Sequence, residues 1–214
     1  MKIIIPARMG SKGLPGKNRT LFRHTANTIP NEYKDHVIVL TDDPEIHKLA
    51  REYKFQSIER LEETATDEAS MKFTLNWATN YLILTGKLEQ GEEIILLYLT
   101  YPERKWSDIE RALDFYHLNE AKSLLCKKEI EHTPFLILKE EEDGRGSQLF
   151  WHDLYRRQDY PKCFELCHFI GIFNSSMINS LNNNLYNNQT MFFPVNSPID
   201  VDTQKDLDKL NENI

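Results

Sequence analysis

A short stretch near the N-terminus combines cationic side chains with glycine. The residues "IIIPARMGSKGLPGKN" (3–18) place Arg8, Lys12 and Lys17 among glycines directly after an apolar run. Glycine lets backbone N–H groups approach an anion closely, and lysine and arginine add charge-assisted hydrogen bonds to phosphate oxygens. The loop therefore predicts a phosphate-binding site. The alternative is a surface loop with incidental lysines, which leaves this density of glycine and positive charge unexplained.

Two familiar phosphate-binding motifs do not fit this loop. A Walker A loop has its second glycine five residues after the first, but Pro15 stands five residues after Gly10. Lys17 is moreover followed by Asn18 rather than by serine or threonine. A Rossmann fingerprint has a glycine two residues after its first, where this chain has Lys12. The predicted phosphate site is therefore of another type.

A pair of carboxylates near the C-terminal end supplies a second chemical signal. In "PIDVDT" Asp200 and Asp202 lie two residues apart on a predicted extended segment, so both side chains point to one side. Such a pair suits a magnesium ion bound beside phosphates, and one of the two could also deprotonate an acceptor hydroxyl. The alternative is an N-cap for a helix over "QKDLDKL".

Alternating strand and helix patterns must position these side chains. Apolar runs predict strands at residues 2–5, 36–40, 93–97, 122–126 and 169–173. Helical patterns lie between several of them, and this alternation predicts an α/β fold with a mainly parallel sheet flanked by helices. In such a sheet the ligand crevice lies beyond the carboxyl ends of the strands, which is where the glycine-rich loop falls.

Three helices have predictable ends. Residues 42–55 have Asp42 or Asp43 as N-cap and Pro44 at the first helical position. Two further helices are predicted at residues 67–86 and 106–118, the second with Ser107 or Asp108 as its N-cap.

One segment interrupts the alternation. Residues 130–161 contain a charged run and an aromatic, basic stretch, and they predict an inserted hairpin with Asp143 and Gly144 at its tip. A hairpin of this kind would form a small subdomain or dimer arm, and a solvated loop without a role is the alternative. The remainder of residues 1–214 predicts a single domain.

Composition narrows the function classes. The chain has 214 residues, 40% hydrophobic and 28% charged, with a net charge of −7. Broad nucleic-acid binding needs a basic face, and a membrane span needs about 20 consecutive apolar residues, so neither partner is expected. No leader pattern precedes the first strand, which predicts a cytoplasmic protein. Three cysteines are an odd number, which argues against a disulfide framework and predicts free thiols. Cys163, Cys167 and His168 lack a second Cys/His pair to complete a zinc site.

The opening loop resembles the signature of a known family. "IIPARMGSKGLPGKN" resembles that of the N-acylneuraminate cytidylyltransferases, the CMP-sialic acid synthetases, and more loosely that of the Kdo cytidylyltransferases. Further segments resemble the family in the same order: "VIVLTDDPEIHKLAREY", "RLEETATDEAS", "IILLYLTYPERKWSDIERALDFY" and "SPIDVDTQKDLDKL". The resemblance implies a Rossmann-like nucleotidyltransferase fold and transfer of CMP from CTP to a sugar acid with release of pyrophosphate. It also implies magnesium as cofactor, a homodimer and a role in cell-surface polysaccharide biosynthesis.

The resemblance also assigns roles to single residues. It implies that the triphosphate is held by Arg8, Ser11, Lys12 and Lys17. Lys17 is the first choice for stabilising charge on the departing pyrophosphate, with Arg8 and Asp202 as further catalytic residues. The positions that correspond to cytidine contacts are Asn18, Arg60 and Ser70. Asp200 and Asp202 are the implied metal ligands, and Asp67 is either a helix cap or a partner of the nucleotide site.

Departures from the family pattern collect on the acceptor side. The residues expected to contact the acceptor are Tyr98, Thr100, Tyr101, Arg104, Arg157, Gln158 and Glu165. Tyr98 stands where the family has glutamine, Tyr101 where it has serine, and Glu165 where an arginine is expected. Because a glutamate would repel a sialic acid carboxylate, the sequence predicts a retained CTP site with an altered acceptor pocket. That pocket would suit a modified nonulosonic acid or another acidic or amino-bearing metabolite.

Other activities stay open at this point. One is a cytidylyltransferase for a different small acceptor, including one of the Kdo type. Another is a nucleotide-binding protein that has lost catalysis, against which the intact loop and both aspartates count.

Overall fold

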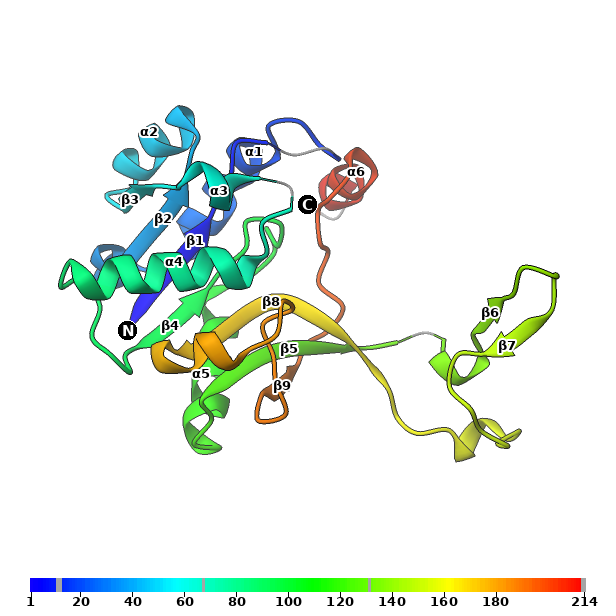
Figure 1. Ribbon diagram of the computed structural model, residues 1–214. Helices are drawn as coiled ribbons and strands as arrows, with labels where there is room; N and C mark the ends of the chain where they lie inside the picture. The colour runs from blue at the N-terminus through cyan, green and yellow to red at the C-terminus, as the bar shows by residue number, and fades with distance from the viewer. Residues whose placement is uncertain (11–12, 67, 131, 213–214) are drawn as a thin grey trace.

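A mixed seven-stranded sheet runs through the centre of the computed structural model, which describes residues 1–10, 13–66, 68–130 and 132–212 (Figure 1). Its strands are β1 (Lys2–Pro6), β2 (Val37–Thr41), β3 (Gln56–Glu59), β4 (Glu93–Leu96), β5 (Ser123–Glu129), β8 (Phe164–Asn174) and β9 (Met191–Pro194). They lie in the order β3-β2-β1-β4-β8-β5-β9. All neighbours are parallel except β8, which is antiparallel to both β4 and β5. The predicted α/β fold with a mainly parallel sheet is therefore confirmed.

The two edge strands are the ones that the sequence patterns do not predict. In β3 only Ile58 is buried, and β9 is half-buried and ends on Pro194. Edge strands are commonly short and polar or end on proline, because one side of each has no strand to pair with. Their apolar pattern is accordingly too weak to stand out.

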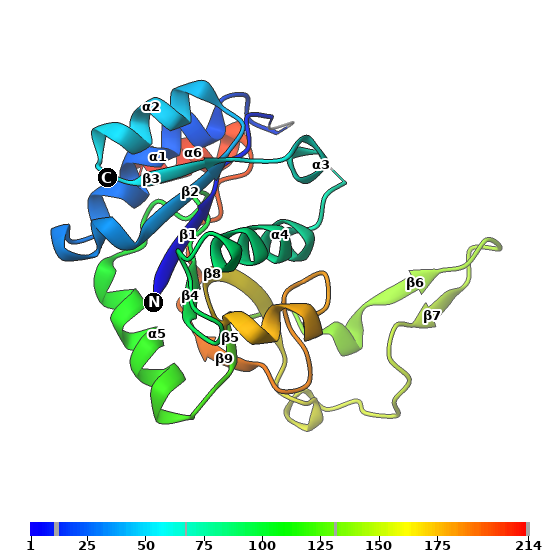
Figure 2. The ribbon, with the colours of Figure 1, turned by 60° about the vertical axis from the view of Figure 1, so that its left-hand side comes forward.

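Helices cover both faces of the sheet (Figure 2). They are α1 (Lys17–Thr28), α2 (Pro44–Glu52), α3 (Glu62–Ala65), α4 (Met71–Leu84), α5 (Trp106–Leu118) and α6 (Gln204–Glu212). Short 3₁₀ helices lie at η1 (Asn31–His36), η2 (Pro134–Leu136), η3 (Arg157–Asp159) and η4 (Ser175–Ser180). Buried residues of α1, α2, α5 and α6 form one core with Ile3 and Ile5, while those of α4 and η4 form a second core with Ile4. The alternation along β1 thus separates the two cores.

Helix ends follow local chemistry. Asp43 caps α2 by accepting a hydrogen bond from the Glu45 N–H at 2.9 Å, with Pro44 next to it, as predicted. The predicted N-cap of α5 is wrong: the helix begins at Trp106, and Asp108 instead accepts from the Lys105 N–H at 2.9 Å. A carboxylate in the third helical position reaches back to the N–H of the N-cap residue, which has no acceptor within the helix.

The long helix α4 starts later than its predicted range. Its N-cap is Ser70, whose hydroxyl accepts from the Phe73 N–H at 3.2 Å. Asp67, the predicted cap or nucleotide-site partner, lies outside the described residues.

A hairpin projects from the sheet between β5 and β8 (Figures 1 and 2). Its strands β6 (Leu138–Glu140) and β7 (Gly146–Gln148) are antiparallel. The turn between them has Gly144 at φ +79°, a conformation that favours glycine, beside an Asp143–Arg145 ion pair of 2.5 Å. We call residues 132–163 the arm.

The strand β8 links the arm to the sheet. Its C-terminal part pairs with both β4 and β5, from Gly171 to Asn174 on the β4 side. Its N-terminal part, from Phe164 to Cys167, pairs with β5 alone and leads directly into the arm. The arm therefore stands on a two-stranded extension of the sheet.

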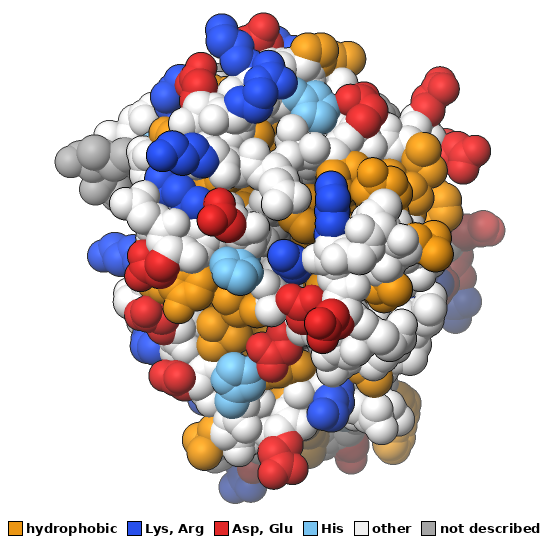
Figure 3. Space-filling model, turned by 90° about the vertical axis from the view of Figure 1, so that its left-hand side faces the viewer, with side chains coloured by type: hydrophobic (Ala, Val, Ile, Leu, Met, Phe, Trp, Pro, Cys, Tyr) orange, Lys and Arg blue, Asp and Glu red, His pale blue; other side chains and the backbone are white. Residues whose placement is uncertain are grey.

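On the face opposite the arm, acidic and basic side chains are interspersed (Figure 3). Within the part of the chain that the structure describes, no helix has the length and apolar character that a membrane crossing requires.

Candidate functional site

Loops at the carboxyl ends of the parallel strands meet at one edge of the sheet. The loop after β1 is tied to β2, because the Ala7 N–H donates to the Leu40 carbonyl at 2.8 Å and the Thr41 hydroxyl donates to the Ala7 carbonyl at 2.5 Å. Further along this loop, the Met9 N–H donates to the Asp42 carboxylate at 2.8 Å. These contacts place the start of the glycine-rich loop over the expected ligand crevice.

A cavity of about 150 Å³ opens at this edge. Its lining residues are Pro6, Arg8, Gly10, Lys17, Asn18, Arg60, Met71, Tyr98, Leu99 and Thr100. Most of the predicted nucleotide residues thus share one cavity, with Tyr98 and Thr100 from the acceptor set. Ser70, the cap of α4, directly precedes Met71 in the chain. Ser11 and Lys12, predicted triphosphate ligands, lie outside the described residues.

Two arginines make the cavity electropositive. Arg60 is 5% exposed, and its guanidinium donates to the Thr64 carbonyl and, at 3.0 Å, to the Thr74 hydroxyl. Burial lowers the pKa of Arg60; the positive charge of Arg8 acts in the same direction and Asp42 opposes it. The Nε of Arg60 is buried and has no hydrogen-bond partner among the described residues.

The helix α1 presents its first turn to the same cavity. Gly16 precedes it with φ +71°, and the first turn contains no acidic residue to neutralise the free N–H groups. Asn18 donates from its side-chain amide to the Arg8 carbonyl at 2.8 Å, which fixes the loop that carries Arg8. A helix N-terminus with adjacent cationic side chains favours phosphate.

Lys17 pairs with a residue from the far end of the chain. Its Nζ lies 2.6 Å from Oδ1 of Asp202, so the predicted phosphate ligand and the predicted metal ligand meet directly. The Asp202 side chain is nonetheless 64% exposed. The pair thus lies at the mouth of the site, where a ligand can displace either partner.

The two predicted metal ligands flank a buried residue. Asp200 and Asp202 are exposed, whereas Val201 between them is buried and donates its N–H to the Thr100 carbonyl at 2.8 Å. This alternation leaves both carboxylates on the side away from Val201. Gly13 permits the close approach of this segment, since a Cβ there would lie 2.5 Å from the Asp202 carbonyl oxygen.

The carboxylates of this pair are not used as helix caps. Thr203 takes that role at the start of α6: its hydroxyl accepts from the Asp206 N–H at 3.4 Å, and the Asp206 carboxylate in turn accepts from the Thr203 N–H at 2.9 Å. Among the described residues, no cluster of three or more His, Cys, Asp or Glu side chains could hold a metal ion. Two carboxylates nevertheless fit magnesium, which typically takes one or two protein carboxylates and completes its shell with water and phosphate.

Tyr98 lines the cavity on the β4–β8 side, and Tyr101 and His168 lie near it. Tyr101 is 4% exposed, its ring packs edge-on against Phe169 with centroids 5.5 Å apart, and its hydroxyl donates to Oδ2 of Asp200 at 2.8 Å. Burial, and then the charge of Asp200, raise the pKa of Tyr101. The same two causes raise the pKa of Tyr98, whose ring centroid lies 5.6 Å from that of His168.

His168 follows Cys167 on β8, and the sequence places both among the departures from the family pattern on the acceptor side, where asparagine and glycine are expected. Its Nδ1 is buried without a hydrogen-bond partner among the described residues. Burial lowers its pKa, and the negative charge of Asp200 opposes this shift.

Arg104 is not directed into the cavity. It is 1% exposed, and its guanidinium donates to the carbonyls of Phe169 at 2.7 Å and Tyr98 at 2.9 Å, and to the Thr25 hydroxyl at 3.3 Å. Burial lowers its pKa to about 10. The predicted acceptor contact is therefore corrected: within one chain, Arg104 joins the loop after β4 to β8 and α1.

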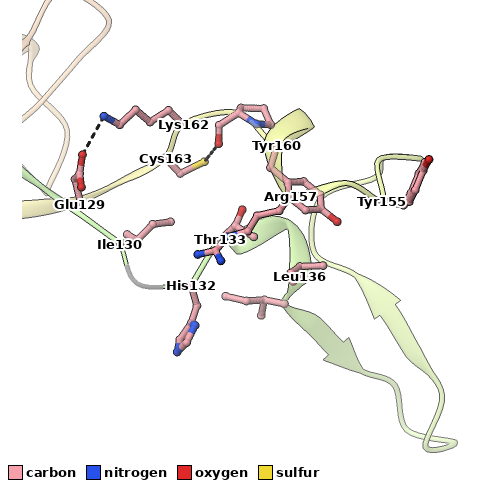
Figure 4. Close-up of a pocket in the computed structure, with 12 residues that line it drawn as sticks. Glu129, Ile130, His132, Thr133, Leu136, Tyr155, Arg157, Tyr160, Lys162 and Cys163 are labelled. Atoms are coloured by element: carbon pink, nitrogen blue, oxygen red, sulfur yellow. Dashed lines mark hydrogen bonds and ion pairs between the residues drawn. The ribbon is translucent and has the colours of Figure 1, made fainter.

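The remaining predicted acceptor residues lie toward the arm. Arg157 and Gln158 belong to η3, and Arg157 lines a separate cavity of about 790 Å³ with Tyr155, Tyr160 and Lys162 among its other walls (Figure 4). The lining residues of this cavity do not include any from the cavity around Arg8.

Glu165 lies in the two-stranded extension of the sheet on which the arm stands. Its carboxylate pairs with Lys128 of β5 at 3.2 Å, directly across the β5–β8 register. The predicted repulsion of an acceptor carboxylate by Glu165 is thus weakened, because a lysine offsets its charge. Within a single chain, Glu165 does not line the cavity around Arg8.

The family model and several curated relatives that this chain matches are described as cytidylyltransferases. Residues 2–86 match the family model described as cytidylyltransferase. The chain is 30% identical over 169 residues to an N-acylneuraminate cytidylyltransferase of Streptococcus agalactiae, covering 73% of this chain and 39% of the relative. It is 32% identical over 170 residues to one of Escherichia coli, with 74% and 37% covered. The chain thus spans less than half the length of these relatives.

A relative of similar length and two solved structures complete the comparison. The chain is 24% identical to post-translational flagellin modification protein B of Campylobacter coli, covering 95% of this chain and 89% of that protein. A CMP:2-keto-3-deoxy-manno-octonic acid synthetase complexed with CTP has a TM-score of 0.68 at 17% identity, with 99% and 97% covered. A 4-diphosphocytidyl-2C-methyl-D-erythritol synthase from Anaerococcus prevotii has a TM-score of 0.62 at 12% identity, with the same coverage. These structures show a Rossmann-like nucleotidyltransferase fold.

Proposed function

We propose that this member of the cytidylyltransferase family transfers CMP from CTP to a sugar acid and releases pyrophosphate. One observation carries the proposal. The loop in the family-matched region brings Arg8 and Lys17 into one cavity with Arg60, and the carboxylates of Asp200 and Asp202 lie at its mouth. This arrangement supplies both halves of what a nucleoside triphosphate with its magnesium ion requires.

In this reaction an acceptor hydroxyl oxygen bonds to the α-phosphorus of CTP while the bond to the pyrophosphate oxygen breaks. Catalysis of such a step is mainly positioning and charge neutralisation. Arg8 and Lys17 neutralise the triphosphate, and Lys17 stabilises the negative charge that grows on the departing pyrophosphate. We propose that the carboxylate of Asp202 takes up the proton that the acceptor hydroxyl loses.

Magnesium would be held by Asp200 and Asp202, and when bound it would neutralise phosphate charge. The Lys17–Asp202 ion pair then has a clear role before the nucleotide arrives. It keeps a cation and a carboxylate mutually compensated at 2.6 Å, and both become available when phosphate takes up Lys17. The exposed carboxylate of Asp202 can return to water when the pair separates, and phosphate replaces it as the partner of the Lys17 ammonium.

Selectivity for cytidine is assigned to the inner wall of the cavity. Arg60 lines it, and Asn18 and Ser70 belong to the two helix starts beside it. A buried donor discriminates between bases, because a base lacking the matching acceptor leaves it unpaired.

The acceptor is proposed to be a carboxylate-bearing sugar of the nonulosonic type, in a pocket altered by Tyr98 and His168. Both named cytidylyltransferase relatives act on N-acylneuraminate by their names, and the relative of similar length modifies flagellin by its name. The ring centroids of Tyr98 and His168 lie 5.6 Å apart, and these two bulky side chains leave less room for an acceptor beside the cavity. We place the reaction in the cytoplasm, in the supply of activated sugars for cell-surface polysaccharide.

The test measures pyrophosphate release from CTP, UTP, ATP and GTP with magnesium and a panel of acceptors. The panel contains N-acetylneuraminate, Kdo and a diamino nonulosonic acid. Release that requires CTP and one sugar acid is expected. Efficient turnover of N-acetylneuraminate would support the cytidylyltransferase but reject an altered pocket. Tight CTP binding without pyrophosphate release with any acceptor would instead favour a protein that has lost catalysis.

We further propose that two copies assemble through their arms. Several large apolar side chains of the arm are exposed, among them Leu136, Leu138, Trp151 and Tyr155, with Trp151 89% exposed. Apolar groups gathered on a projection usually mark a protein interface. Because Arg157 does not line the cavity around Arg8 in its own chain, an arm that reaches a second copy would bring Arg157 and Gln158 to that copy's acceptor.

A further inference from the structure

We infer that Tyr101 is a positioning residue for the carboxylate of Asp200, rather than a group that contacts the acceptor. The inference rests on the proposed function, since it concerns the carboxylate assigned to magnesium. It differs from the sequence prediction, in which Tyr101 belongs to the acceptor pocket.

The contact itself is direct. The Tyr101 hydroxyl donates to Oδ2 of Asp200 at 2.8 Å, across 99 positions in the chain. A hydroxyl has one proton to donate, so this bond uses it fully. The other contact of the hydroxyl is the Cys167 thiol at 3.8 Å, which acts as donor. Tyr101 therefore has no proton left to offer an acceptor.

The ring of Tyr101 is fixed by its surroundings. It is 4% exposed, and Phe169 of β8 holds it edge-on, with the ring planes at 90°. Tyr101 also follows Thr100, whose carbonyl accepts the Val201 N–H at 2.8 Å. The tyrosine and the carboxylate are thus clamped to each other by side-chain and backbone bonds at adjacent positions.

The consequence concerns the free oxygen of Asp200. Because Oδ2 is engaged by Tyr101, Oδ1 remains for a cation. A carboxylate that is hydrogen-bonded on one oxygen loses less rotational freedom when it binds a metal, and outer partners of this kind commonly change metal affinity or activity by about 10–100-fold. Asp202 is held differently, by Lys17, so the two carboxylates have independent supports.

The decisive experiment compares Tyr101→Phe with the wild-type protein and with Tyr116→Phe. Tyr116 is a second buried tyrosine, 3% exposed on α5, and serves as the matched control. The primary readout is Mn²⁺ binding, followed by its paramagnetic resonance signal in the presence of a non-hydrolysable CTP analogue. Nucleotide affinity without metal, the thermal midpoint, and KM for magnesium and for the acceptor are measured alongside.

We expect Tyr101→Phe to weaken Mn²⁺ binding and raise KM for magnesium by about 10-fold, with nucleotide affinity in metal-free buffer unchanged. Tyr116→Phe should leave Mn²⁺ binding as in the wild type. In an Asp200→Asn background the effect of Tyr101→Phe should largely vanish, because the two residues act through one contact.

Two results would overturn the inference while leaving the proposed function intact. One is Mn²⁺ binding by Tyr101→Phe equal to that of an active wild type. The other is a rise in acceptor KM alone, which would return Tyr101 to the acceptor pocket. Absence of pyrophosphate release from the wild-type protein with every acceptor would instead strike at the proposed function.

Discussion

At the scale of single residues, Lys17 joins the two ends of the chain in one ion pair. We predict that Lys17→Ala lowers kcat for pyrophosphate release by about 10²-fold or more, because it removes a charge that stabilises the leaving group. Stability should change by no more than about 1 kcal/mol, since the partner carboxylate is largely exposed. Activity and the thermal midpoint are measured together.

Lys87→Ala, at an exposed lysine beyond α4, is the control for this substitution. A loss of activity that merely follows a large fall in thermal midpoint would show that Lys17 is structural. An unchanged kcat would remove it from the catalytic step.

His168 gives the molecule a defined pH response. Its pKa in the folded protein is lowered by burial, whereas in the unfolded chain it lies at about 6.5. As pH falls below the unfolded value, the unfolded chain takes up the proton first, so the free energy of unfolding decreases toward acid. At pH values well above 6.5 the imidazole is neutral in both states and contributes nothing to this dependence.

Urea unfolding at pH 7.5 and pH 5.5 checks this expectation. The difference in the free energy of unfolding between the two pH values should shrink in His168→Gln. It should persist in His24→Gln, because His24 is exposed on α1. An identical difference in His168→Gln and the wild type would contradict it.

At the scale of elements, the glycine-rich loop and the segment before α6 depend on each other. Gly13→Ala places a methyl group 2.5 Å from the Asp202 carbonyl oxygen, so the two backbones must separate. We predict a loss of about 1–3 kcal/mol in the free energy of unfolding, as for overpacked sites, and weaker nucleotide binding. Urea unfolding and calorimetric titration with CTP measure the two effects.

Gly146→Ala serves as control, because its new Cβ would meet only the flexible Leu138 side chain at 3.4 Å. Equal stability of the Gly13 and Gly146 variants would show that the loop can move away from Asp202 without cost.

The elements that local sequence predicts are those with local causes. The helix α2 follows from Asp43 and Pro44, and strands β1, β2 and β4 follow from their apolar runs. The helix α1 is not predicted, since "KNRTLFRHTANT" is mostly polar and buries few side chains. The antiparallel direction of β8 is set by pairing with β4 and β5, which no local pattern encodes.

The same division holds within the site. Arg8 and Lys17 are predicted from the composition of their loop, and both line the cavity. The contacts of Lys17 with Asp202 and of Tyr101 with Asp200 join residues that are 185 and 99 positions apart, so the sequence alone cannot pair them. Arg104 has the residue type of an anion ligand, and only its burial assigns it to the core.

At the scale of the whole molecule, the exposed apolar side chains of the arm lead us to expect that two copies of the chain associate. Trp151→Glu with Leu138→Glu places charges on two exposed apolar positions of the arm, 89% and 65% exposed. We predict that this double variant shifts the protein from dimer to monomer in light scattering coupled to size-exclusion chromatography. Folding should be retained, because neither side chain contributes to the buried cores.

Leu84→Glu is the control, because Leu84 of α4 is 85% exposed and lies outside the arm. A wild-type protein that is monomeric at every concentration would reject assembly through the arm. So would a double variant that remains dimeric.

The strand β8 gives the arm a mechanical connection to the site. Its residues from Phe164 to Cys167 pair with β5 alone, and the ring of the next residue, His168, packs against Tyr98, which lines the cavity. The β5–β8 register shifts between Cys167 and Ile172, so His168 lies at an irregularity of the ladder where the extension that carries the arm joins the sheet. Because a bulge bends its strand, the proposed docking of the arm would act on the orientation of His168 beside Tyr98.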